Sequence, residues 1–147
     1  MLISTRLISL CFFKMYKISK TFQFDAAHRL TFHEWKCFNV HWHRYTVCIE
    51  LSSLDTDSNG FIKDFSTFTW IKNRLDDNRD HGYIYHTSDE VWIFLKEKWY
   101  KIFDFDQLEP TAENMAKFLY TLIAEKESLI SKVTVYETPT SLAEYSL

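Results

Sequence analysis

Three histidines in this 147-residue chain are spaced as the ligands of a metal centre would be. His41 and His43 are one residue apart, so on an extended strand both side chains point to the same face. His28 ends an earlier alternating stretch, and a hairpin would bring it to the same edge of the sheet. Three neutral imidazoles with an open fourth position form the ligand set of a catalytic zinc. Alternatively, they are unrelated polar residues near a sheet edge.

Cys37 lies four residues before His41 and is the next candidate for chemistry. Beside a metal, the positive charge would lower the pKa of the thiol, and the thiolate would serve as a base or a nucleophile. Two other interpretations stay open. Cys37 is also suited to be the fourth ligand of a closed structural site, or it is a buried thiol without chemistry.

Two carboxylates are further candidates. Glu137 continues the apolar alternation of Val133 and Val135, where an ionised carboxylate needs partners. Either the strand ends there and Glu137 is solvated, or it awaits a ligand with adjacent N–H donors. Asp80 precedes His81, and an Asp that orients a His forms a proton-transfer pair. A bare Asp-His dipeptide also fits an ordinary surface loop.

Hydrophobic alternation predicts the strands that must position these residues. Half-buried strands are expected over 18–28, 41–51, 132–138 and 142–145. Helical spacing and capping signals predict three helices between the second and third strands, beginning near Asp64 or Ser66, near Thr87–Glu90 and at Pro110–Thr111. We see no βαβ alternation. The order predicts an α+β domain with an antiparallel four-stranded sheet and helices packed on one face.

Composition excludes several classes of protein. The chain holds 13 Phe, 8 Tyr and 5 Trp but only 2 Gly and 2 Pro, which excludes a disordered or linker-rich protein. A net charge of −3 gives no basic field for nucleic acid, and no apolar run suits a membrane span. Three Cys without framework spacing favour a reducing compartment, the cytoplasm. We interpret residues 1–14 as a loose extension, with Met15 a possible true start, and residues 15–147 as a single domain.

Six segments together resemble, in the same order, the family of 6-pyruvoyltetrahydropterin synthase and 6-carboxytetrahydropterin synthase. They are FDAAHRL (24–30), KCFNVHWHRY (36–45), GFIKDFSTF (60–68), RDH (79–81), PTAEN (110–114) and VYETPT (135–140). The resemblance implies the tunnelling fold (T-fold). In that fold two antiparallel hairpins and their helices form a subunit, three subunits close a twelve-stranded barrel, and two trimers stack.

The resemblance also implies a role for each candidate residue. It makes His28, His41 and His43 the Zn²⁺ ligands. It makes Cys37, Asp80 and His81 the catalytic residues. Glu137 would anchor the 2-amino and N3 edge of the pterin, and Thr111 would border the pterin. The implied substrate is 7,8-dihydroneopterin triphosphate. Triphosphate elimination and side-chain cleavage would give 6-carboxytetrahydropterin and acetaldehyde, on the route to queuosine and other 7-deazaguanines. The implied partners are this substrate and further copies of the chain, as a trimer or dimer of trimers.

Several departures from the family pattern keep alternatives open. Trp42 stands where the family usually has Gly between the paired histidines, and segment 82–109 is long and holds an extra helix. The short gap from Cys37 to His41 is that of the 6-carboxy branch, and the runner-up is the 6-pyruvoyl-forming synthase. Glu34 leaves room for the branch that forms 6-hydroxymethyl-dihydropterin. The remaining alternatives are a non-catalytic zinc-stabilised pterin-binding module and a relative that has lost turnover through Trp42.

Positive side chains close to the histidines are candidates for contact with the triphosphate. They are Arg29, Lys36 and Arg44. A local positive charge could suit an anion despite the negative net charge. Each of the three is equally well explained as an ordinary solvated charge.

Overall fold

The computed structural model describes residues 15–98, 100–105 and 107–147. The expected extension at residues 1–14 lies outside the described residues. The elements in chain order are β1 (Tyr16–His28), the 3-10 helix η1 (Lys36–Phe38), β2 (His41–Ser53), the 3-10 helix η2 (Phe65–Phe68), α1 (Thr69–Asn78), β3 (Gly82–Tyr85), α2 (Val91–Glu97), β4 (Ile102–Asp104), α3 (Ala112–Ala124), β5 (Ile130–Thr138) and β6 (Ser141–Ser146).

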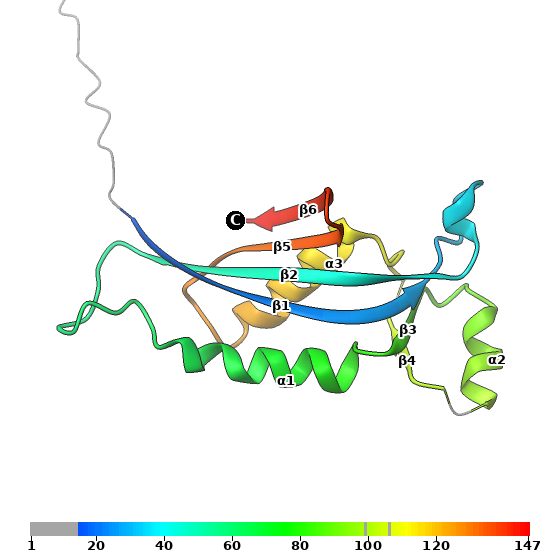
Figure 1. The fold of residues 1–147 in the computed structure, drawn as a ribbon, viewed down its shortest axis with the longest axis horizontal. Helices are drawn as coiled ribbons and strands as arrows, with labels where there is room; N and C mark the ends of the chain where they lie inside the picture. The colour runs from blue at the N-terminus through cyan, green and yellow to red at the C-terminus, as the bar shows by residue number, and fades with distance from the viewer. Residues whose placement is uncertain (1–14, 99, 106) are drawn as a thin grey trace, which may run out of the picture.

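One sheet with strand order β4-β3-β1-β2-β5-β6 organises the molecule (Figure 1). β1 and β2 pair antiparallel along their whole length, from Tyr16 opposite Ser53 to His28 opposite His41. β5 pairs antiparallel with β2, and β6 with β5. These are the four strands predicted from hydrophobic alternation, and the α+β class is confirmed.

Two short strands extend the sheet beyond the predicted four. β3 pairs in parallel with the last residues of β1, and β4 pairs in parallel with β3. Together with α2 they form a βαβ unit, so the expectation of no such alternation is wrong for this segment. β3 begins at Gly82, where an added Cβ would lie 2.1 Å from Cε2 of Phe103 on β4. The close approach of the Phe103 ring therefore requires a residue without a side chain.

The hydrophobic core lies between the sheet and the helices α1 and α3. Alternate strand residues point into it, including Phe24, Val47 and Val135, where they meet Leu75 of α1 and Leu119 of α3. We call this side of the sheet the covered face. The residues between them form the other side, the open face, whose side chains are mostly polar and mostly half-buried or exposed. Gln23, Asp25, Arg44 and Thr46 are examples. The predicted packing of helices on one face is confirmed.

Side-chain caps start the helices near the predicted places. The Asp64 carboxylate accepts from the backbone N–H of Ser66 at 2.7 Å, and Thr111 accepts from that of Asn114 at 3.3 Å. Before α2, Asp89 accepts from the N–H of Val91 at 3.0 Å, in place of a cap from the expected Thr87–Glu90 box. None of the described helices has the length and apolar character needed to cross a membrane.

Candidate metal centre and active site

Strand register brings the three candidate histidines together. His28 lies directly opposite His41 and Ala26 lies opposite His43, so all three imidazoles stand on the covered face at one end of the hairpin. His28 is fully buried, and the other two are half-buried. One ring nitrogen from each lies within 4.8 Å of the others. The spacing of three ligand atoms around one point is that of a metal site.

Backbone carbonyls fix which nitrogen carries the proton in two of the three rings. Nδ1 of His28 lies 2.8 Å from the carbonyl oxygen of Pro110, and Nδ1 of His41 lies 2.7 Å from that of Asn39. Carbonyls only accept, so both Nδ1 atoms donate and both Nε2 lone pairs remain free in the neutral rings. The two Nε2 atoms are 3.1 Å apart, and the buried Nε2 of His43 has no hydrogen-bond partner. A cation between the three rings would satisfy all of these lone pairs.

The surroundings of His28 and His43 favour the neutral form of imidazole that binds metals. Burial lowers the pKa of His28 to about 4, against the favourable hydrogen bond to Pro110. Burial also lowers the pKa of His43, and the negative charge of Glu137 partly opposes this. Neutral imidazole is the ligating species, so the lowered pKa values of His28 and His43 favour metal binding.

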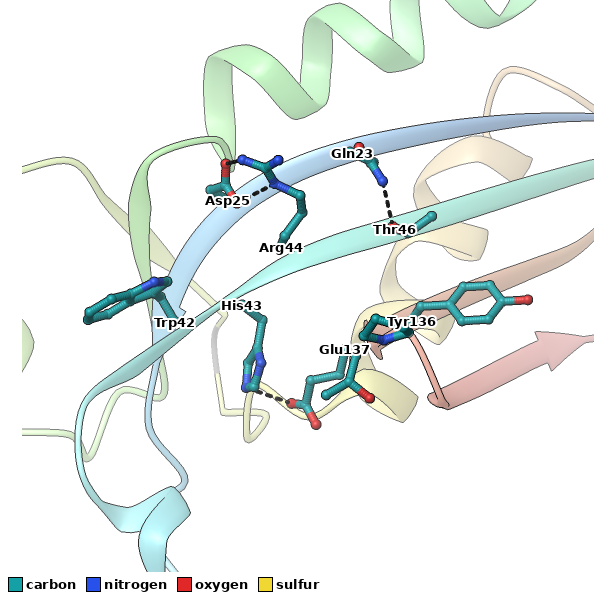
Figure 2. A pocket seen from close by; sticks show the side chains of 10 residues that line it. Gln23, Asp25, Trp42, His43, Arg44, Thr46, Tyr136 and Glu137 are labelled. Atoms are coloured by element: carbon teal, nitrogen blue, oxygen red, sulfur yellow. Dashed lines mark hydrogen bonds and ion pairs between the residues drawn. The ribbon is translucent and has the colours of Figure 1, made fainter.

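Glu137 faces the histidines from the end of β5. Its Oε1 lies 3.5 Å from Nε2 of His28. The same oxygen lies 3.8 Å from Nε2 of His43 (Figure 2). The carboxylate is therefore turned toward the cluster and is not simply solvated at a strand end. With His43 it lines a pocket of about 710 Å³ at the sheet edge, which also includes Trp42, Arg44, Thr46 and Tyr136. A small planar ligand has room beside both groups.

Cys37 and Thr111 lie near the same end of the hairpin. Cys37 belongs to η1, which links β1 to β2 beyond His28 and His41, and its thiol is free and half-buried. Its carbonyl accepts from the backbone N–H of Leu30 at 2.8 Å, which fixes the turn. Thr111 caps α3 directly after Pro110. The residue that holds His28 thus adjoins the predicted pterin neighbour.

Asp80 and His81 form the predicted pair just before β3. Nδ1 of His81 lies 2.7 Å from Oδ2 of Asp80. The other oxygen of Asp80 accepts from the backbone N–H of Asp25 at 2.9 Å, and this bond, with that from His81, lowers the pKa of the carboxyl. His81 has φ 56°, a left-handed conformation that is uncommon for a residue with a side chain. The backbone is bent here, and the imidazole is 77% exposed.

This pair lies on the other side of the sheet from the histidine cluster. His81 lines a cleft of about 590 Å³ with open-face residues, among them Asp25, Ala27, Trp42 and Arg44. These residues alternate along β1 and β2 with the three clustered histidines. The structure therefore joins His28, His41, His43 and Glu137, but it does not bring His81 to them within one chain.

Other residues support the site in ways that the sequence did not reveal. The Pro110 and Asn39 groups are backbone carbonyls, which every residue has, so no side-chain pattern marks them. Arg29, a candidate for phosphate contact, is paired with the buried Asp89 at 2.6 Å, and Tyr83 donates to the same carboxylate. This cluster ties the turn before α2 to the segment after His28.

A second phosphate candidate, Arg44, is likewise engaged. It forms two hydrogen bonds with the Asp25 carboxylate, from Nε at 3.0 Å and from Nη2 at 2.9 Å (Figure 2). Tyr45, next on the covered face after His43, buries its hydroxyl without a hydrogen-bond partner. Burial and the charge of Glu137 raise the pKa of Tyr45. The phenol therefore stays protonated, as a donor beside the cluster.

Comparison with known proteins gives concordant results. The 6-pyruvoyl tetrahydropterin synthase family matches residues 17–147. The 6-carboxy-5,6,7,8-tetrahydropterin synthase of Haemophilus influenzae is 37% identical over 141 residues, covering 89% of this chain and 99% of that protein. The enzyme of the same name from Rickettsia felis is 33% identical, covering 88% and 99%.

Solved structures share the fold at lower identity. An uncharacterized protein from Wolinella succinogenes superposes with a TM-score of 0.79 at 22% identity, over 90% of this chain and 98% of that one. The 6-pyruvoyl tetrahydropterin synthase of Caenorhabditis elegans superposes with a TM-score of 0.68 at 22% identity, over 90% and 96%. The arrangement of strands and helices is that of these proteins.

Proposed function

Because the chain belongs to the 6-pyruvoyl tetrahydropterin synthase family, we propose that it is a zinc-dependent 6-carboxy-5,6,7,8-tetrahydropterin synthase. The reaction converts 7,8-dihydroneopterin triphosphate into 6-carboxytetrahydropterin, acetaldehyde and triphosphate, on the route to queuosine. One observation carries the proposal. A cluster of three inward-facing imidazoles stands beside a carboxylate in a pocket, within a chain 37% identical to an enzyme of that name.

His28, His41 and His43 are the proposed zinc ligands. Three nitrogen donors with a fourth position for substrate are typical of catalytic zinc, and imidazole suits that metal. When bound, zinc would act as a Lewis acid toward the side-chain hydroxyls of the substrate. The chain's own contribution is orientation, because the carbonyls of Pro110 and Asn39 hold two of the rings with Nε2 toward the centre.

Glu137 is the proposed anchor of the pterin ring. Its carboxylate accepts from the 2-amino group and the ring N3–H, and charge-assisted pairs of this kind fix orientation as well as contribute affinity. The pocket that it lines is open enough for a planar ring. Thr111, capping α3 beside Pro110, is the proposed neighbour of the bound pterin.

Proton transfer is assigned to Cys37 and His81. The Cys37 thiolate takes a proton from the substrate side chain, and His81, oriented by Asp80, acts as the partner acid and base. Since His81 opens onto the other face, it serves a site whose metal cluster belongs to a neighbouring copy. In this proposal the working site is shared between two subunits.

Unpaired strand edges support such an assembly. Among the described residues, the outer edge of β1 over residues 16–24 and the outer edge of β6 have no strand partner. Free edges pair readily with other strands, and we propose that copies join edge to edge as a trimer or dimer of trimers. The free thiols of Cys37 and Cys48 suit the cytoplasm, where we place the enzyme.

A product assay tests the function. Purified zinc-loaded protein is incubated with 7,8-dihydroneopterin triphosphate, and acetaldehyde and the pterin product are measured. Release of acetaldehyde in step with 6-carboxytetrahydropterin is the expected result. A 6-pyruvoyl product without acetaldehyde would assign the chain to the pyruvoyl-forming reaction instead. Retention of zinc and pterin with no turnover would leave a binding module.

A further inference from the structure

The position of Glu137 carries an inference beyond ring anchoring. Its Oε1 lies 3.5 Å from Nε2 of His28 and 3.8 Å from Nε2 of His43, while Nε2 of His28 and Nε2 of His41 are 3.1 Å apart. Zinc bonds of about 2.0–2.1 Å in a tetrahedron separate neighbouring ligand atoms by about 3.3–3.4 Å. The carboxylate oxygen is thus placed beside these two imidazoles at close to the spacing of a further ligand.

A hydrogen bond to His28 does not explain the position of the Glu137 carboxylate. Nε2 of His28 carries a lone pair, because Nδ1 of the same ring donates to Pro110. The carboxylate oxygen therefore faces an acceptor. Within the described part of the chain, His28 and His43 are the only ion-pair partners of Glu137. A divalent cation between these atoms would turn the mismatch into coordination.

The backbone at Glu137 allows the side chain to take a second position. The pairing of β5 with β6 shifts register between Tyr136 and Thr138, so Glu137 sits in an irregularity that aims its side chain out of the regular ladder. Its side chain is 29% exposed and lines the pocket of about 710 Å³. Rotation about the side-chain bonds of Glu137 would turn the carboxylate away from the histidines and further into this pocket.

We propose that Glu137 is an exchangeable fourth ligand of the metal, bound when the pterin site is empty and withdrawn when the ring edge binds. The inference rests on the metal centre and ring anchor of the proposed function. Coordination places Oε1 between the histidines, whereas the ring-edge contact needs both oxygens turned into the pocket, so the carboxylate takes one position or the other. Binding of the pterin ring thus frees the fourth coordination position for the substrate side chain. Without pterin, Glu137 occupies this position and small anions bind weakly.

Cobalt-substituted protein tests the proposal without any turnover. Wild type, Glu137→Gln, Glu137→Asp and the control Glu144→Gln are loaded with Co²⁺ and titrated with azide, with the visible absorption of the metal as the readout. Gln keeps the shape and removes the charge. Asp keeps the charge and is one methylene shorter. Glu144 lies on β6, where it pairs with Lys132, so its substitution controls for a general change of charge.

The expected result is azide binding at least about 10-fold tighter in Glu137→Gln and Glu137→Asp than in wild type and Glu144→Gln. The two Glu137 variants also differ from wild type in their azide-free spectra. Identical spectra and azide affinities in wild type and Glu137→Asp would overturn the proposal, because charge alone would then explain any effect of Gln. Circular dichroism of each variant confirms that it is folded.

Exchange is tested by adding 7,8-dihydropterin, which has the ring edge but lacks the hydroxylated side chain that would itself occupy the fourth position. Ring binding, followed by pterin fluorescence, is expected to raise the azide affinity of wild type to that of Glu137→Gln. Bound ring with unchanged azide affinity would contradict withdrawal of the carboxylate. These readouts are independent of acetaldehyde release, so a failed product assay with the expected azide pattern would reject the reaction and keep the ligand.

Discussion

The carboxylate of Asp80 accepts a hydrogen bond from the backbone N–H of Asp25 at 2.9 Å, across 55 residues of sequence. The carbonyl of Asp25 accepts in turn from the N–H of His81 at 2.6 Å. Asp80 also holds the His81 imidazole at 2.7 Å. One carboxylate thus fixes both the end of a strand and the orientation of the proposed acid/base.

Removal of this carboxylate is expected to affect stability and turnover together. Asp80→Ala loses both hydrogen bonds and lowers the free energy of unfolding by about 1–3 kcal/mol. It also lowers kcat by roughly 10²–10⁴-fold, because His81 is no longer oriented. Urea unfolding and the product assay measure the two effects. Asp80→Asn keeps an acceptor for the Asp25 N–H and is the control, with a smaller loss of stability.

The same carboxylate predicts a pH dependence. Asp80 has its pKa lowered in the folded chain, below the ordinary 3.8, by the Asp25 N–H and by His81. Its stabilising effect is therefore complete above about pH 3.8 and is lost as the pH falls through the lower folded pKa. Urea unfolding at pH 5, 4 and 3 is expected to show the difference between wild type and Asp80→Asn shrinking with acidity. A difference that stays constant would contradict this linkage.

Metal removal is expected to destabilise the chain reversibly. Dipicolinate treatment lowers the melting temperature, because bound metal stabilises only the folded state, by about 2.7 kcal/mol at a free concentration 100 times Kd. Added Zn²⁺ restores the melting temperature. His43→Ala is the control, since it lacks one proposed ligand and is expected to melt at the same temperature with and without the chelator. A chelator shift that persists in this variant would place the metal elsewhere.

Cys37→Ala separates a catalytic thiol from a structural ligand. Zinc content, measured by atomic absorption, is expected to stay at the wild-type level while turnover falls by roughly 10²–10⁴-fold. Cys48→Ala, at the other free cysteine of the described residues, is the matched control and is expected to keep both. Joint loss of zinc and activity in Cys37→Ala would instead identify Cys37 as the fourth ligand of a closed site.

Local pattern was sufficient to predict part of the site. A period of two along β1, β2 and β5 placed His28, His41, His43 and Glu137 on apolar faces, although β5 joins β2 only by long-range pairing. The hairpin of β1 and β2 brought the three histidines together. Such pairing follows from neighbouring strands in the chain, which is why it could be read from the sequence. The caps of Asp64 and Thr111 are equally local.

Long-range pairing was beyond that reasoning. β3 and β4 have four and three residues, too few to show a period. β3 pairs in parallel with β1, and β4 with β3, and the pairing of β3 places the preceding His81 on the open face. The partner of Arg29 is Asp89, 60 residues away. Nothing in the sequence around either residue indicates that the two side chains form an ion pair. Contacts between distant segments cannot be predicted from local sequence patterns. The same holds for hydrogen bonds to backbone carbonyls such as that of Pro110.

The proposed division of the chemistry between two faces has a consequence for mixed populations of chains. A chain with His28→Ala still supplies an intact acid/base pair, and a chain with His81→Ala still supplies an intact imidazole cluster. Co-expression of the two inactive variants would yield mixed oligomers. In some sites an intact histidine cluster from one chain would then meet an intact acid/base pair from its neighbour, in about a quarter of the sites if chains assemble at random. Recovery of about a quarter of the wild-type activity would show that two subunits share each site. If each site lay within a single chain, the mixture would have no activity.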